Sequence, residues 1–304
     1  MRRTWILPLV LIIECLVLGA FAPHFWDLQN ILDRSRHFVE IGIVASAMTF
    51  VILSAGIDLS VGSIMGLSGT VAGFAWHYGG MSLAAACLLA GLVGVAAGGF
   101  NGWVVSRFTI PPLLVTLAGL ALYRGLAYGI AKEHTVTDFP AAFQGIGQAY
   151  AGVVPVQLFF LAAVFLFMAW LFHRSLFGRQ VALLGENEIA ARLVGVPIQR
   201  IQLILYTLSG GLSALAGLIY TARLNTAKPD ACEGYELDVI ACVVLGGTRI
   251  TGGQGSMLGT FMGLMIVGLL RYGLELAGIS SVWITFTIGS LLIATAILNE
   301  KLAA

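Results

Sequence analysis

The sequence carries little charge, and neither sign is in excess. Asp, Glu, Lys and Arg make up 10% of its 304 residues, whereas soluble domains carry roughly 25%. The net charge of +1 provides no basic surface, so we expect no nucleic-acid partner. Hydrophobic residues, at 59%, and a mean hydropathy of +0.94 argue against a water-soluble enzyme.

Metal-binding and nucleotide-binding patterns are also lacking. The five histidines have no i,i+4 pairing, so we predict no metal site and no cofactor. No G-x-x-x-x-G-K-S/T loop occurs, so the chain cannot bind ATP in the manner of a cassette ATPase. The four cysteines lack CxxC spacing, which indicates buried thiols rather than disulfides or a zinc site: Cys15, Cys87, Cys232 and Cys242.

About ten apolar runs have the composition of membrane segments, and a crossing helix needs about 20 residues. One of them, Leu237 to Leu245, is too short to cross alone and is predicted to be an arm of a broken or re-entrant element. The fold class is therefore an all-α polytopic membrane protein with a single transmembrane domain over 1–304. The runs lie near Trp5 to Phe21, Phe38 to Ser54, Val61 to Trp76, Met81 to Val105, Pro112 to Ile130, Val156 to Phe172, Ile201 to Tyr220, Leu237 to Leu245, Met257 to Tyr272 and Val282 to Leu298.

The first run has two interpretations. Arg2 and Arg3 precede it and Ala20-Phe21-Ala22 closes it, as in a signal peptide. Glu14 suits neither interpretation, and we favour a retained helix. The placement of Arg and Lys between the runs then predicts that both termini are cytoplasmic. On this orientation the longest inward loop, about 172–200, is distinctly basic.

Glycine is abundant, with 38 residues, which favours closely packed membrane helices. A faint internal repeat joins VILSAGIDLSVGSIMG at 51–66 to VVLGGTRITGGQGSMLG at 243–259. Each stretch has an apolar arm, a polar break with glycine, and Gly-Ser before a helix of small residues. Paired interrupted helices in the two halves of a chain point to a transport site.

Polar residues inside the apolar runs are the candidate site residues. Asp58 lies between two apolar segments, and ionisable groups at membrane depth are costly enough to mark function. We expect Asp58 or Ser60 to cap the following helix, with direct solute contact as the second interpretation. Arg124 is predicted to snorkel to the headgroups or to line a pathway. Asn101 is predicted to bond across helices or to contact a hydroxylated solute.

The inward loop predicts a short helix outside the bilayer. Asn187 is a capping residue, Glu188 complements the helix N-terminus, and Arg192 lies toward the other end. Gly195 and Pro197 stop the helix after about two turns. Such a helix is shaped to dock onto a partner. The alternative is an interfacial amphipathic turn with no partner. We interpret the cassette-signature letters LSGG at 208–211, inside an apolar run, as a coincidence.

These residues resemble the permease subunits of bacterial ABC importers for monosaccharides, the group that includes ribose, xylose, arabinose, rhamnose and autoinducer-2 permeases. The resemblance covers about Phe38 to Leu298, and Ala55 stands where the family more often has glycine. The loop also resembles the EAA-type coupling loop of other importers. The blocks that carry it are GIDLSVGS at 56–63, Asn101-Gly102 with Pro111, Pro112 and Thr116, the loop from Ala182 to Gly195, VLGG at 244–247 and GGQGS at 252–256.

The resemblance implies a dimeric permease in the bacterial inner membrane, paired with an identical or homologous second permease. Its partners would be two cytoplasmic ABC ATPase subunits, a periplasmic sugar-binding protein and membrane lipid. We assign the solute pathway to Asp58, Ser60, Ser63, Asn101, Thr116 and Arg124, and the ATPase coupling to Glu188, Ala190, Ala191, Arg192 and Gly195. Within the coupling segment, Ala190 and Ala191 are expected to seat in a groove of the ATPase.

Three alternatives remain open. A branched-chain amino-acid ABC permease of the same superfamily would need charged or dipolar groups to complement a zwitterion. An ion-coupled secondary transporter is favoured by the broken helices but not by the capped cytoplasmic loop. A polytopic membrane enzyme would need converging His, Asp or Glu groups at one depth, and the sequence has no such cluster.

Overall fold

The computed structural model describes residues 6–22, 24–132 and 134–301. Helices dominate this part of the chain, and its four strands, of two residues each, are confined to loops. The elements are α1 (Ile6–Phe21), α2 (Leu28–Leu53), α3 (Val61–His77), α4 (Leu83–Phe108), α5 (Pro112–Ala131), β1 (Val136–Thr137), α6 (Ala141–Gln148), β2 (Tyr150–Ala151), β3 (Val154–Pro155), α7 (Val156–Arg174), α8 (Leu176–Glu186), α9 (Glu188–Leu193), α10 (Ile198–Leu224), β4 (Thr226–Ala227), α11 (Tyr235–Leu245), α12 (Met257–Leu276) and α13 (Ser281–Lys301).

Six helices of the described chain are long and apolar enough to cross a membrane: α2, α4, α5, α7, α10 and α12. Shorter apolar segments lie in α1 and α13. The chain is thus an all-α membrane protein, and the count of about ten membrane-embedded helices stays a prediction. Helix α2 begins at Leu28, ten residues before the expected start, with Asp27 as its N-cap. Charged residues in its first turns hid this start from a hydropathy criterion: Asp33, Arg34 and Arg36.

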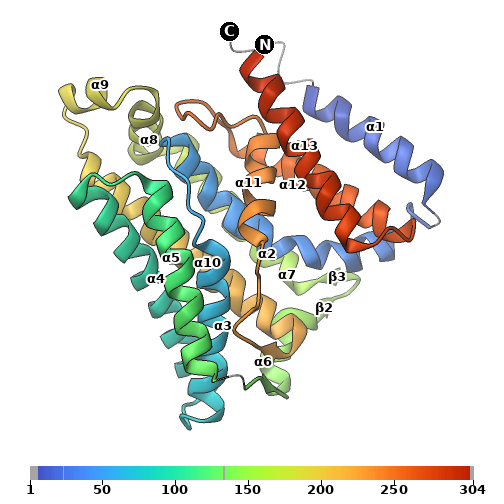
Figure 1. Ribbon diagram of the computed structural model, residues 1–304. Helices are drawn as coiled ribbons and strands as arrows, with labels where there is room; N and C mark the ends of the chain where they lie inside the picture. The colour runs from blue at the N-terminus through green and yellow to red at the C-terminus, as the bar shows by residue number, and fades with distance from the viewer. Residues whose placement is uncertain (1–5, 23, 133, 302–304) are drawn as a thin grey trace.

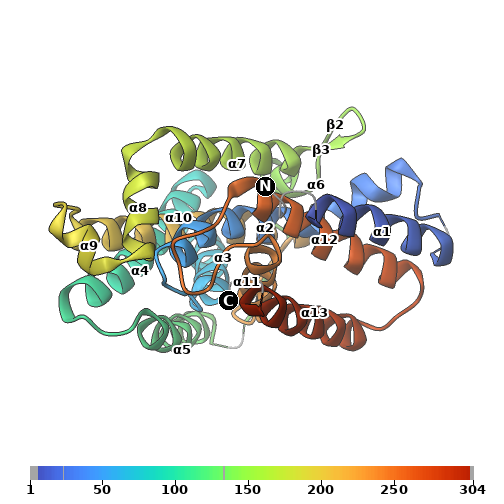
Figure 2. The ribbon, with the colours of Figure 1, turned by 90° about the horizontal axis from the view of Figure 1, so that it is seen from above.

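The helices form an elongated bundle. Seen from above, α7 runs along one long side, α5 and α13 lie on the opposite side, and α2, α3, α10 and α11 lie between them (Figure 2). Helices α8 and α9, the start of α1 and the end of α13 are all on the upper side in Figure 1. The start of α1 and the end of α13 thus share one side with α8 and α9, and which side of the membrane this is stays a prediction.

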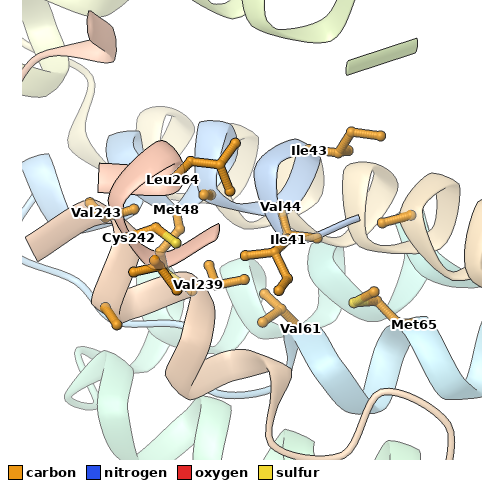
Figure 3. Close-up of a cluster of buried hydrophobic side chains, with 14 of the residues drawn as sticks. Ile41, Ile43, Val44, Met48, Val61, Met65, Val239, Cys242, Val243 and Leu264 are labelled. Atoms are coloured by element: carbon orange, nitrogen blue, oxygen red, sulfur yellow. The ribbon is translucent and has the colours of Figure 1, made fainter. Parts of the chain in front are cut away.

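Small residues bring the central helices together. A Cβ added at Gly94, Gly98 or Gly210 would overlap the backbone of the facing helix, so α4 and α10 cross at backbone contact. The LSGG motif therefore has a structural role, because Gly210 lies where α4 and α10 cross. Apolar side chains of α2, α3, α11 and α12 form the adjoining core, which includes Val44, Met48, Val61, Val239 and Leu264 (Figure 3).

Both predicted breaks are present, and they meet. Residues 54–60 separate α2 from α3, and residues 246–256 separate α11 from α12. The backbone N–H of Gly253 donates to the carbonyl oxygen of Leu53 over 2.9 Å. Beside this bond, a Cβ added at Gly185 of α8 would overlap both the Leu53 carbonyl and the Gly253 nitrogen. Ala55 adopts a left-handed backbone with φ of +62°, a conformation that suits glycine better.

Candidate functional site

A network of buried polar side chains surrounds Asp58 in the first helix break. One carboxylate oxygen accepts from the Ser60 backbone N–H at 3.0 Å and from the Ser60 hydroxyl at 2.6 Å. The other oxygen accepts from the Ser209 hydroxyl of α10 at 2.7 Å. Asp58, Ser60 and Ser209 have no exposed surface. Because a buried carboxylate is costly without donors, these three hydrogen bonds are what make the site tenable.

The network continues into α4 and α5. The Asn101 amide donates to the Ser60 hydroxyl at 2.9 Å, and the Tyr123 hydroxyl lies 2.8 Å from the Asn101 oxygen. The Thr116 hydroxyl donates to the carbonyl of Ile57 at 3.0 Å, and the Ser63 hydroxyl donates to that of Ser60 at 2.7 Å. Five of the six predicted pathway residues therefore lie in one cluster that ties the break to three helices.

The expected capping geometry is wrong in detail. Ser60 is the N-cap residue of α3, but its side chain makes no capping hydrogen bond. Asp58 accepts from the N–H of Ser60 itself, one residue before the helical N–H groups begin. The reason is that the Ser60 hydroxyl is already committed to Asp58 and Asn101. The cluster holds the break in place from several helices, rather than ending one helix.

Sequence reasoning missed two members of this network, Ser209 and Tyr123. Ser209 was hidden within the LSGG letters, and its partner Asp58 is 151 residues away in the chain. Tyr123 precedes Arg124 in an apolar run, and its partner Asn101 is 22 residues away in the chain. Both residues could have been found as hydroxyl-bearing side chains inside apolar spans, because such side chains form hydrogen bonds between helices in lipid.

Arg124 lies apart from this network, and the snorkelling interpretation is wrong. Its Nη1 donates to the carbonyl oxygens of Pro229 at 2.5 Å and Ala231 at 2.8 Å. The guanidinium is thus turned inward onto the loop that precedes α11, because that loop presents carbonyls without helical partners. Arg271 of α12 also has a partner within the chain and pairs with Asp238 of α11 at 2.8 Å.

The predicted helix in the inward loop is confirmed as α9. The Asn187 side chain accepts from the N–H of Ala190 at 3.0 Å, and Arg192 pairs with Glu188 at 2.9 Å. Gly195 has φ of +81°, which ends the helix in the way that glycine allows. Local sequence specifies this element completely, since cap, ion pair and stop all lie within nine residues.

The exposed surface of α9 differs from the expected one. Ala190 is exposed, but Ala191 is 1% exposed and packs inward with Val196 and Ile198. Ala191 therefore supports the helix from below and cannot seat in a partner. The large apolar side chains that do face outward are Ile189, Leu193 and Val194, at 73%, 84% and 72% exposed. Exposed apolar groups of this size mark an interaction surface.

A groove of about 550 Å³ adjoins α9. Its walls are the turn between α4 and α5 and the start of α10. Arg200 contributes positive charge to it, whereas Arg192 is paired there with Glu188. Helix α9 contributes Glu188 and Arg192 to its lining, so the groove adjoins the helix that carries the exposed apolar side chains.

Interrupted membrane helices and an exposed, capped helix such as α9 are typical of a membrane transport subunit. The chain belongs to the family described as the permease component of branched-chain amino acid transport systems, which matches residues 30–296. It is therefore a multi-pass membrane protein and a transport component. No solved structure gives a significant match to the chain.

Curated relatives match over nearly the full length of both chains. The ribose import permease protein RbsC of Bacillus subtilis is 38% identical over 97% of this chain and 92% of its own. RbsC of Escherichia coli K12 is 37% identical, over 92% and 89%. The autoinducer 2 import system permease protein LsrD of Klebsiella pneumoniae is 35% identical, over 93% and 87%.

Proposed function

We propose that this chain is the permease subunit of an ATP-driven ABC importer that moves a monosaccharide or sugar-like solute into the cytoplasm. The observation that carries the proposal is the match to ribose and autoinducer 2 import permeases over nearly the whole chain. The lack of a phosphate-binding loop assigns ATP hydrolysis to a partner. The location is the bacterial inner membrane, with both termini cytoplasmic.

The ATPase partner docks on α9. Ile189, Leu193 and Val194 provide the apolar contact, while Glu188, Ala190 and Arg192 provide its polar and small-residue rim. Gly195 fixes the exit of the chain from the helix. The groove beside α9 extends this surface toward the turn between α4 and α5.

The movement of α9 reaches the membrane through Gly185, two residues before the Asn187 cap. Gly185 lies against Leu53 and Gly253, one at each helix break. A displacement of α8 must therefore shift both breaks together. The buried Asp58 network then transmits this shift to α4, α5 and α10, which supports a positioning role for Asp58, Ser60, Ser63, Asn101 and Thr116 in alternating access.

The remaining partners follow from the same proposal. A second permease copy or a homologous permease completes the membrane core, and a periplasmic sugar-binding protein delivers the solute. The branched-chain amino-acid alternative is less favoured, because these relatives are named for ribose and autoinducer 2. The ion-coupled alternative leaves the exposed apolar surface of α9 without a partner.

Reconstitution tests the proposal directly. The tagged chain is purified with its ATPase, placed in proteoliposomes with ATP inside, and supplied with binding protein and labelled D-ribose outside. We expect accumulation that requires both ATP and the binding protein. Uptake that continues without ATP and collapses with the ion gradient would reject the ABC mechanism. Uptake of leucine but not ribose would select the amino-acid alternative.

A further inference from the structure

The segment before α11 returns deep into the molecule as a non-helical chain. After β4, which pairs with β1, it runs back along α3: Ala227 lies against Gly73, the Ala231 carbonyl against Gly66 and the Cys232 carbonyl against Gly62. Eleven helical residues separate Gly73 from Gly62, so the segment descends by about 16 Å. Helix α11 then begins at Tyr235, beside the first turn of α3.

Non-helical backbone at this depth requires donors for its carbonyl groups. In a membrane such backbone is tolerated only where protein surrounds it or where it lines a water-filled cavity. Arg124 supplies donors from α5, because its Nη1 bonds to the carbonyls of Pro229 and Ala231. Both bonds use this one nitrogen, which leaves the rest of the guanidinium for another partner.

Glu236 lies one turn of α3 away from Arg124. Its Oε2 packs over Gly62, while the Arg124 Nη1 packs over Gly66. Residues four apart on a helix lie on the same face, so the two charged groups share one face of α3. They form no salt bridge with each other within the described chain. Oε2 of Glu236 is buried and has no hydrogen-bond partner among the described residues.

The Glu236 carboxylate interacts with the backbone N–H groups of Gly234 and Glu236, but these do not supply a partner for Oε2. Asp238, the other acidic residue in the first turn of α11, is satisfied by Arg271. Glu236 is held near the N-termini of α3 and α11, whose dipoles favour a negative charge. A carboxylate oxygen kept at this depth without a donor of its own is expected to meet one that the single chain does not contain.

Exposed side chains adjoin Glu236 on one side of the molecule. Helix α11 lies between α5 and α13 (Figures 1 and 2). Next to Glu236, Leu237 is 58% exposed and Glu233 is exposed. A solute that moves along this side therefore passes Arg124 and Glu236, at the level where α3 and α11 begin.

We propose that Arg124 and Glu236 form a solute-binding site for a neutral, polyhydroxylated molecule, with Glu236 Oε2 accepting from one hydroxyl and the Arg124 guanidinium donating to another. This site rests on the proposed sugar-import function and adds Glu236, a residue outside the predicted pathway. The two charges are of opposite sign, so a neutral solute leaves the site without a net charge. Hydroxyls provide the donor and the acceptor that the two side chains need.

Protection of an introduced cysteine tests binding without relying on transport. Leu237→Cys, beside Glu236 and at a position that is 58% exposed, is placed in the complete importer after the four native cysteines are replaced. Its labelling by a methanethiosulfonate reagent is timed with and without D-ribose. At twice the dissociation constant, ribose should slow labelling about threefold. Glu275→Cys, at the far end of α12, is the control and should label at an unchanged rate. Equal labelling of Leu237→Cys with and without ribose overturns the site, and protection by leucine instead overturns the solute class.

Uptake by two further variants separates this inference from the proposed function. Glu236→Ala removes a charged acceptor, and we expect about a tenfold loss of ribose uptake while ATP hydrolysis continues. Glu236→Gln keeps an acceptor and the side-chain shape, so its uptake should fall by less. Glu275→Gln should match the unmodified chain. Failure of the unmodified complex to take up ribose rejects the proposed function, whereas full uptake by Glu236→Ala rejects only the site.

Discussion

The N–H of Gly253 bonds to the carbonyl of Leu53 over 2.9 Å, which joins the two interrupted helices at one point. Gly185 of α8 lies directly against both groups. Helix α8 and the two helix breaks thus share a junction built from backbone atoms. Backbone contacts leave no flexible side chain to absorb a movement, so under the proposed function a displacement at α9 would pass to both breaks.

Replacement of Gly185 tests this junction. In Gly185→Ala the new methyl group would overlap the Leu53 carbonyl, and we expect a loss of about 1–3 kcal/mol of stability. Gly91→Ala on α4 is the matched control, because a Cβ there meets no atom within 4 Å. Thermal unfolding in detergent should show a lower Tm for Gly185→Ala alone. Equal Tm values for both variants would mean that α8 does not press on the breaks.

The surface of α9 predicts different outcomes for its two alanines. Ala190→Arg changes an exposed position, so the permease should fold and lose its ATPase partner during purification. Ala191→Arg would bury a cation among Val196 and Ile198, and should reduce the amount of folded permease in the membrane. Size-exclusion chromatography with quantification of the bound ATPase distinguishes the two effects. Retention of the ATPase by Ala190→Arg at the normal ratio would place the docking surface elsewhere.

The network around Asp58 predicts graded effects of substitution. Asp58→Asn keeps an acceptor and the side-chain shape, so it should retain partial transport. Asp58→Leu leaves the donors of Ser60 and Ser209 without an acceptor and should abolish folding. Ser209→Ala removes one donor to the buried carboxylate, and we expect it to cost about 1–3 kcal/mol. Unfolding midpoints and uptake rates for the three variants check this order. A fully active Asp58→Leu permease would contradict the positioning role.

Long apolar runs are the part of this fold that sequence reasoning predicts well, because lipid demands them wherever a helix crosses. The α9 helix was also predictable, since Asn187, Glu188 and Gly195 act locally. The start of α2 was missed, because its charged first turns resemble a loop. Helix α8 was missed for the same reason, as Arg179 and Glu186 flank its short apolar centre.

The candidate site was predictable only in part. Asp58 and Asn101 stood out as polar residues at membrane depth, but their partners depend on how distant helices cross. The role of Arg124 depends on the path of residues 228–234, a non-helical segment whose course along α3 is set by Gly62 and Gly66. Without that course, the sequence does not place Glu236 near Arg124. Such long-range juxtapositions are determined by packing rather than by local pattern.

Helices α2 and α10 are also joined by a buried ion pair. Glu40 has no exposed surface, and Arg223 of α10 donates to it at 2.8 Å. Arg223 also lies 3.1 Å from His37 and stacks over the ring of Tyr220. Removal of one partner leaves a charge buried without compensation, so Glu40→Leu or Arg223→Met alone should cost about 3–5 kcal/mol.

The double variant decides between a stabilising pair and a pair retained for another reason. With Glu40→Leu and Arg223→Met together, neither desolvated charge remains, and stability should return to within about 1 kcal/mol of the unmodified chain or exceed it. Chemical unfolding of the four proteins in detergent measures the coupling. Additive losses would show that the two residues act independently. Recovery of stability without recovery of uptake would assign the pair to the transport cycle, at the level where α2 and α10 must move together.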